Sequence, residues 1–444
     1  MVETQLTQQT PHDYVLQSFV IHSHRHFKPV DVASNVVMFQ IYEDINKPYL
    51  TGNFVLHDDI RFADGIKLNG TELVEITITQ PGVDGVPVTL NFMITTIDDT
   101  QKTSDGVEIL TLSMIEQSLF NNSLKEFSKA YQGKPSEIIQ KICMDQLGLG
   151  VDLPEVSEAQ GSMKIVIPFL DAFTVCNMML NRMTTIEGLP YYLFKTMKNE
   201  NLQLKSLEEM MLQPSWNKQP YVFSNASKSQ AQQRLTTENI FNVEKYSSSN
   251  MDGIFDMVVG GMVGSTYTVT DIGSSASESF HHNLDDTYRM LTNIGIIEPT
   301  EEPTIATGTY GIDNLEIEKM SNMVSSGLIF NKTYNDHKNF HQELHGSELQ
   351  LMVTKRAILS LLNKGVVKMQ VPGLPFLVDQ EHRSLGTNVD LITMSNNSSF
   401  ETKGDELVDK RRSGKYMIFG ARHIFDENDQ HRTNIAISKL GSGK

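Results

Sequence analysis

Cysteine and basic residues are scarce in this chain of 444 residues. The two cysteines, Cys143 and Cys176, can form neither a disulfide framework nor a four-cysteine zinc site, so they indicate a reducing compartment. The 37 lysines and arginines are outnumbered by 54 aspartates and glutamates, which gives a net charge of −17. Because phosphate binding needs a basic surface, this balance argues against general affinity for nucleic acid.

Long apolar runs are also missing from the sequence. The most apolar stretch, residues 163–180, is interrupted by Lys164, Pro168 and Asp171. No run reaches the roughly 18 to 20 apolar residues that a membrane span requires, so we expect none. The polar first 14 residues lack the basic start and apolar core of a secretory signal, so we expect a protein made and used without this type of export.

What is present predicts a folded protein of roughly two to four domains, because 39% of residues are hydrophobic and 20% are charged. From about residue 15 to residue 116, apolar residues recur at every second position, as in Leu110, Leu112 and Met114. Turn sequences such as Asn69-Gly70 separate these runs. The pattern predicts an antiparallel β domain, either a barrel or a sandwich.

The spacing of apolar residues then changes to that of a helix. Within residues 117–147 the apolar residues after Pro135 share one helical face, which predicts a helix there. A second helix is expected to begin at the N-cap Asp171. Apolar runs near 191–194 and 202–207 predict strands and a short helix that close an α+β unit before about residue 230.

The last part of the chain again predicts β structure. Strands are expected at 241–246 and 255–269, followed by a polar stretch to residue 346 that we interpret as a long, largely surface insertion. We expect that a short linker could replace residues 274–308 without loss of folding. Ser347 and Gln350 form a capping-box pattern before a helix. Further strands are expected at 367–371, 389–394, 416–425 and 434–440.

The predicted fold class is therefore mainly β with α+β: two tube-like antiparallel β-barrel domains and a central α+β region, the second barrel being discontinuous. Two barrels of similar size would fit a diverged duplication, although no strict repeat is visible. The expected boundaries are 10–118 for the first barrel, 119–236 for the central domain, 237–271 and 347–444 for the two parts of the second barrel, and 272–346 for the polar insertion.

Three blocks of sequence, in this order, resemble baseplate central hub proteins of contractile-tailed bacteriophages. They are the segment 131–142 (YQGKPSEIIQKI) after the first β domain; the segment 165–173 (IVIPFLDAF) with Arg182, 192–194 and 204–207; and the closing set 367–373 (VKMQVPG), Gly386 before a Val-Asp-Leu strand, 413–418 (SGKYMI) and Arg422-His423. Each motif is loose by itself, whereas the ordered set covers most of the chain.

The resemblance implies a structural virion protein of the tail baseplate, assembled in the host cytoplasm. Family hubs are homotrimers in which each subunit supplies two barrels, so that a six-barrel ring joins a hexameric tail tube to a trimeric puncturing spike. The implied partners are a trimeric spike protein and a tail tube or tube-initiator protein, with no stable nucleic-acid binding and no membrane span. Three copies would carry three times −17, or −51, which suits a channel that passes DNA without retaining it. A merely solvated acidic surface explains the charge equally well.

Two alternatives to this interpretation stay open. The first is a hub of a related contractile injection or secretion apparatus, in which the spike is often fused to the hub; this sequence contains no valine-glycine octad repeats of such a spike. The second is a metal-dependent tail hydrolase. The sequence contains no Gly-x-Ser-x-Gly elbow, no Walker loop and no catalytic Cys/His signature, so we expect neither an enzyme nor a bound cofactor.

Two groups of histidines are the weak candidates for metal ligands. His22, His24 and His26 alternate in a predicted strand, so their imidazoles would share one face at spacings of about 7 Å. A solvated or interfacial strand face is the preferred interpretation, because Arg25 and Lys28 lie close by. The second group recurs every four residues and departs from the His-Glu-x-x-His pattern of zinc proteases. It consists of His337, His341 and His345.

Acidic residues of the first β domain are the candidates for a channel wall. They are Glu43, Asp44, Asp58, Asp59, Asp98 and Asp99. Outer turns would accommodate such residues equally well. The adjacent pairs Asp58-Asp59, Asp98-Asp99 and Asp285-Asp286 are poor acid/base partners, because neighbouring side chains of a strand face opposite ways.

Overall fold

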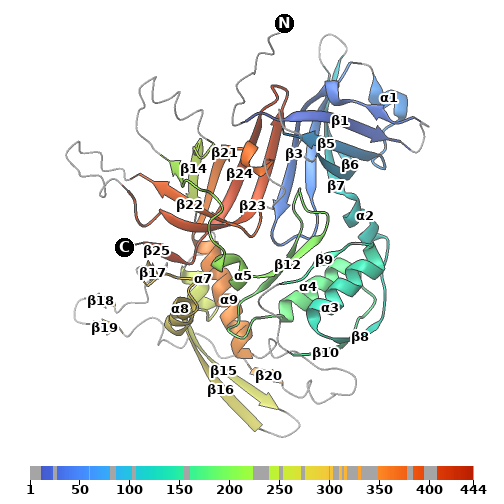
Figure 1. Ribbon diagram of the computed structural model, residues 1–444. Helices are drawn as coiled ribbons and strands as arrows, with labels where there is room; N and C mark the ends of the chain where they lie inside the picture. The colour runs from blue at the N-terminus through green and yellow to red at the C-terminus, as the bar shows by residue number, and fades with distance from the viewer. Residues whose placement is uncertain are drawn as a thin grey trace, which may run out of the picture.

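A computed structural model of the chain describes residues 12–23, 28–59, 61–80, 87–102, 107–154, 161–223, 240–249, 254–271, 276–299, 301–303, 310–312, 315–317, 329–331, 349–377, 384–394 and 408–443. Its main feature is one 13-stranded sheet that runs through both β domains, with most of the labelled helices in the lower half of the view (Figure 1). The expected fold class, mainly β with a central α+β region, is confirmed.

The first β domain contains seven strands in the order β3-β4-β7-β6-β5-β1-β2. Successive side chains of a strand point alternately to the core and to the surface, so that Val74, Ile76 and Ile78 of one strand are buried. The elements are β1 Val15–His22, β2 Val30–Asp31, the 3-10 helix η1 Ala33–Asn35, β3 Val36–Asp44, β4 Thr51–Asp58, helix α1 Phe62–Ile66, β5 Leu73–Thr79, β6 Val88–Lys102 and β7 Glu108–Glu116.

The second β domain is assembled from two separate parts of the chain. Its strands follow the order β14-β21-β24-β23-β22-β13, and Val222 of the last strand bonds through its backbone to Phe241 and Val243, just before the first, which closes a ring. The expected discontinuity is confirmed. The strands are β13 Tyr221–Phe223, β14 Lys245–Ser249, β21 Val366–Pro372, β22 Asn388–Thr393, β23 Gly414–Asp426 and β24 His431–Ser438.

Strand β23 belongs to both barrels. Its 13 residues pair with β22 and β24 of the second barrel, and its second half pairs with β3 of the first barrel over seven positions, from Gly420 opposite Asp44 to Asp426 opposite Met38. The turn after β23 also bonds to the chain before β1, where Tyr14 N donates to Asp429 O at 3.2 Å. The two barrels therefore share a long hairpin rather than a linker (Figure 1).

The central region packs three helices against small sheets below the first barrel (Figure 1). The expected N-cap is confirmed, because the carboxylate of Asp171 accepts a bond from Thr174 N at 3.0 Å. Cys143 and Cys176 are free, buried thiols whose sulfurs lie 3.8 Å apart. The elements are α2 Gln117–Ser123, β8 Ala130–Gly133, α3 Pro135–Ile142, a π-helical turn η2 Cys143–Leu147, β9 Val151–Asp152, β10 Met163–Val166, α4 Ala172–Arg182, β11 Tyr191–Phe194, β12 Leu202–Ser206 and α5 Leu207–Leu212.

The segment after β14 corrects two expectations. Residues 255–269 are not one strand but a helix followed by a strand. The polar stretch 272–346, expected to be largely surface, contributes Leu284, Tyr288 and Leu291 to the core of the second barrel region. The expectation that a short linker could replace residues 274–308 is therefore wrong. The elements here are α7 Ile254–Val259, β15 Gly264–Asp271, β16 Ala276–Asn283, α8 Leu284–Asn293, β17 Glu301–Pro303, β18 Tyr310–Ile312, β19 Leu315–Ile317 and β20 Ile329–Asn331.

The expected helix across the C-terminal sheet is present as α9 Leu349–Lys364, with Ala357, Ile358 and Leu361 buried. The 3-10 helix η6 Leu374–Phe376 and strand β25 Gly441–Gly443 complete the fold. None of the described helices has both the length and the apolar character needed to span a membrane.

Candidate functional site

The junction of the two barrels concentrates the buried polar groups of the sheet. Glu43 on β3, His423 on β23, and His431 and Thr433 on β24 are each at most 4% exposed. Each lies on the inward face of its strand, the face that also carries core residues such as Ile41. The shared hairpin thus carries a polar cluster to the position where the two cores meet.

Short contacts connect this cluster. His423 Nδ1 lies 3.2 Å from His431 Nε2 and 3.2 Å from Thr433 Oγ1, and His423 Nε2 lies 3.6 Å from Glu43 Oε1. The same carboxylate oxygen accepts a bond from Met197 N at 2.6 Å, in the loop that follows β11. The cluster therefore links both barrels to the central region.

The cluster favours a charged Glu43 and a neutral His431. Burial alone would raise the pKa of Glu43, but the bonds from His423, Ser384 and Met197 N lower it below its usual range. Burial lowers the pKa of His431 well below its usual range, and the nearby imidazoles of His423 and His12 lower it further. A buried carboxylate that is held charged by fixed donors is a structural element of the junction.

Aromatic rings cross the junction beside the polar cluster. The ring of Phe425 stacks on that of Phe39 from β3, with centroids 4.4 Å apart, and on its other side on His431, at 4.1 Å. Tyr14 meets Phe425 edge-on at 4.9 Å. Burial of this stack makes the orientation of one barrel depend on the other.

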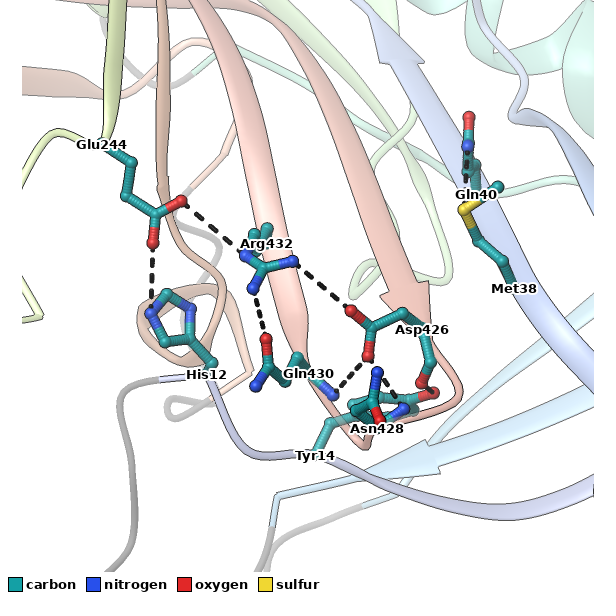
Figure 2. Close-up of polar contacts among 9 residues, drawn as sticks. All are labelled: His12, Tyr14, Met38, Gln40, Glu244, Asp426, Asn428, Gln430 and Arg432. Atoms are coloured by element: carbon teal, nitrogen blue, oxygen red, sulfur yellow. Dashed lines mark hydrogen bonds and ion pairs between the residues drawn. The ribbon is translucent and has the colours of Figure 1, made fainter. Parts of the chain in front are cut away.

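A chain of ion pairs lies at the edge of the junction (Figure 2). Glu244 contacts His12 at 3.2 Å and Arg432 at 3.7 Å, and Arg432 contacts Asp426 at 3.4 Å. Asp426 also accepts a bond from the hydroxyl of Tyr14 through its backbone oxygen at 3.0 Å. These contacts fasten the residues before β1 to both parts of the second barrel.

Two of the six acidic channel candidates are wrong. Glu43 belongs to the buried cluster described above. Asp58 is 3% exposed, because its carboxylate accepts bonds from Phe62 N and Ala63 N at the start of α1. Neither side chain can line a channel, since each one satisfies donors inside the fold.

The other four candidates lie at the surface. Asp59, Asp98 and Asp99 are exposed, and Asp44 is half-buried. Bonds from the hydroxyls of Ser113 and then Thr96 lower the pKa of Asp98, so it carries its charge at neutral pH. Asp285 and Asp286 occupy the first turn of α8, which follows the N-cap Asn283.

The histidine candidates are not brought together in the part of the chain that the structure describes. His22 is exposed at the end of β1, and His24, His26, His337, His341 and His345 lie outside the described residues. Within the described ranges, no group of three or more His, Cys, Asp or Glu residues is placed to hold a metal ion.

The shared β23 and the two rings of strands allow a comparison with known proteins. No protein-family model and no curated protein matches this sequence. Among solved structures, the chain is similar to the tail protein from Neisseria meningitidis MC58, with 13% identity, a TM-score of 0.52, and coverage of 96% of this chain and 97% of that one. The chain has the fold of this tail protein. The similarity confirms the expected fold and extends to the fold alone.

Two further solved structures are similar over most of their length. The 43 kDa tail protein of prophage MuSo2 from Shewanella oneidensis is 8% identical, with a TM-score of 0.47 and coverage of 96% of this chain and 98% of that one. An E. coli component of the type VI secretion system is 8% identical, with a TM-score of 0.42 and coverage of 96% and 77%.

Sequence reasoning missed the buried cluster at the junction. Its signal is nevertheless present in β3, where Phe39, Ile41 and Glu43 alternate on one face and place the carboxylate on the core side. A charged residue in phase with core residues predicts a buried, partnered group.

Proposed function

We propose that this chain is a structural virion protein, the central hub of a phage tail baseplate, and that it acts as a homotrimer. The observation that carries this proposal is the pair of barrels that share β23, in a fold common to a solved tail protein. Three such chains would supply six barrels, which match the subunits of a hexameric tube on one side and a trimeric spike on the other.

In this proposal the protein needs no catalysis. Its role would be to hold barrels at fixed positions around a channel. The buried junction supports this role, because it fixes the two barrels of one subunit relative to each other. The partners would be a trimeric spike protein and a tail tube or tube-initiator protein, with assembly in the host cytoplasm. A hub of a related contractile injection or secretion apparatus would use the same architecture, so the identity of the bound spike distinguishes the two.

Native mass spectrometry of the full chain, alone and with its spike protein, tests the assembly. We expect a species of three times 50.0 kDa, or 150 kDa, and a six-lobed ring by negative-stain electron microscopy. A stable 50.0 kDa monomer at micromolar concentration, with no trimer after the spike is added, would refute the proposal.

The acidic channel is tested separately with surface carboxylates. If either Asp98 or Asp99 faces the channel, the double substitution Asp98→Lys and Asp99→Lys should give the trimer salt-dependent binding to duplex DNA, because lysines release counterions from phosphates. The control carries Asp285→Lys and Asp286→Lys on α8, outside the first barrel. Equal DNA binding by both variants would show that position in the ring is irrelevant.

A further inference from the structure

A cationic recess lies at the side of the second barrel, away from the junction. It has a volume of about 290 Å³ and is bordered by the end of β14, the C-terminus of α9, the start of β21 and residues 411–416. Four basic side chains line it, together with two tyrosines: Lys364, Arg411, Arg412, Lys439, Tyr246 and Tyr416. In a chain with a net charge of −17, this concentration of cations runs against the overall balance.

The cations of this recess are only partly neutralised. Arg412 pairs with Asp409 at 3.7 Å, and Glu301 lies near enough to Lys439 to act on its charge. Within the described ranges, the side chains of Lys364 and Arg411 make no hydrogen bond or ion pair. Four positive charges thus face two carboxylates.

Lys439 is held in the recess with donors to spare. Its ammonium lies 4.9 Å from the centre of the Tyr416 ring, and among described residues its hydrogen bond goes to Ser413 O at 2.6 Å. An ammonium carries three N–H donors, so two remain for a ligand.

Burial disfavours the charged forms of two lysines that line the recess. Burial lowers the pKa of Lys439 to about 8, although Glu301 and Asp409 act in the opposite direction. Burial also lowers the pKa of Lys364. A bound anion would offset this desolvation by direct charge-assisted hydrogen bonds.

We propose that this recess binds carboxylates of an acidic polypeptide segment from a partner chain. The volume accommodates one or two carboxylate side chains, and the guanidinium of Arg411 can bind a carboxylate through two parallel hydrogen bonds. A nucleic acid is disfavoured, because the four cations are gathered in one recess of about 290 Å³, whereas a phosphate backbone binds through a run of such contacts along its length. This proposal goes beyond the hub assignment and does not depend on it.

The test uses fluorescence anisotropy of the full chain with a labelled hexaglutamate peptide, and hexaglutamine as the uncharged control. Arg411→Glu should weaken peptide binding about 10- to 100-fold, the effect of losing a charge-assisted bond of roughly 1.5 to 3 kcal/mol. Lys410→Glu is the matched control, because Lys410 is the adjacent exposed cation and does not line the recess. Its effect should be about twofold or less.

Several outcomes would overturn the proposal. These are failure of the unaltered chain to bind hexaglutamate, equal loss of binding in Arg411→Glu and Lys410→Glu, and stronger binding of inorganic phosphate or duplex DNA than of the peptide. If thermal melting shows that Arg411→Glu does not fold, Lys364→Gln takes its place with the same expected direction. Peptide binding without a trimer would refute the hub assignment and leave the recess assignment intact.

Discussion

Lys355 on α9 connects the second barrel region to the central domain, and its substitution should lower the free energy of unfolding. The side chain is 6% exposed, and its ammonium donates to three backbone oxygens at the end of α4: Leu180 O at 2.7 Å, Asn181 O at 3.1 Å and Met183 O at 3.2 Å. A cation at this end also interacts favourably with the helix dipole. Lys355→Met removes these three hydrogen bonds and keeps most of the aliphatic part of the side chain.

The magnitude follows from two opposing effects. A hydrogen bond to a charged group contributes roughly 1.5 to 3 kcal/mol after desolvation is counted, but three bonds from one ammonium do not add in full. Burial lowers the pKa of Lys355 to about 8, so desolvation offsets part of the gain from these bonds. The expected loss in Lys355→Met is therefore about 2 to 4 kcal/mol.

Urea unfolding at pH 7, followed by circular dichroism and by the fluorescence of Trp216, measures this loss. Arg356→Met is the matched control, because Arg356 is the next residue of α9 and is exposed. We expect the control to change the free energy of unfolding by about 0.5 kcal/mol or less. Equal effects of the two substitutions would show that the bonds to α4 contribute nothing beyond a surface charge.

Three further substitutions test the core and the junction. Because the folded-state pKa of His431 lies well below its usual value, the unfolded chain binds more protons than the folded chain below about pH 6.5. The free energy of unfolding should therefore decrease as the pH is lowered below that value. His431→Asn should make this decrease smaller, whereas the exposed control His57→Asn should leave it unchanged. Leu291→Ala, in the stretch expected to be surface, should cost about 2 to 5 kcal/mol in urea unfolding, and a surface-like value below about 0.5 kcal/mol would contradict its burial. Gly386→Ala should cost about 1 to 3 kcal/mol in the same assay, because Gly386 has a φ of +72° and a Cβ would lie 2.6 Å from Met210 Sδ; no loss would refute this strain.

Strands with strict alternation and capped helices could be predicted from the sequence. The segment 73–79 alternates without a break, and the sequence of 347–364 has a capping-box pattern followed by an apolar stripe, so local signals were sufficient. The helix at 254–259 could not be identified in the same way, because six residues span less than two turns and its Phe and Val residues also favour strands. Composition misled the interpretation of α8, although Leu284, Tyr288 and Leu291 recur at helical spacing.

The junction could not be predicted from local patterns, because its partners are far apart in sequence. His423 and Glu43 are 380 positions apart, and only the pairing of β23 with β3 brings them together. The acidic channel hypothesis treated Glu43 as a surface residue for this reason. A carboxylate on the core side of a strand has a predictable need for partners, but the partners themselves are set by tertiary pairing.

The shared hairpin has a consequence for how a hub could be built. Two barrels joined by a flexible linker would pay the entropy of fixing their orientation at assembly. In this chain the seven pairs between β23 and β3, together with the stack of Phe39, Phe425 and His431, fix that orientation within one subunit. Contacts between subunits in the proposed trimer would then need to set only the threefold arrangement, because the position of one barrel relative to the other is already determined by folding.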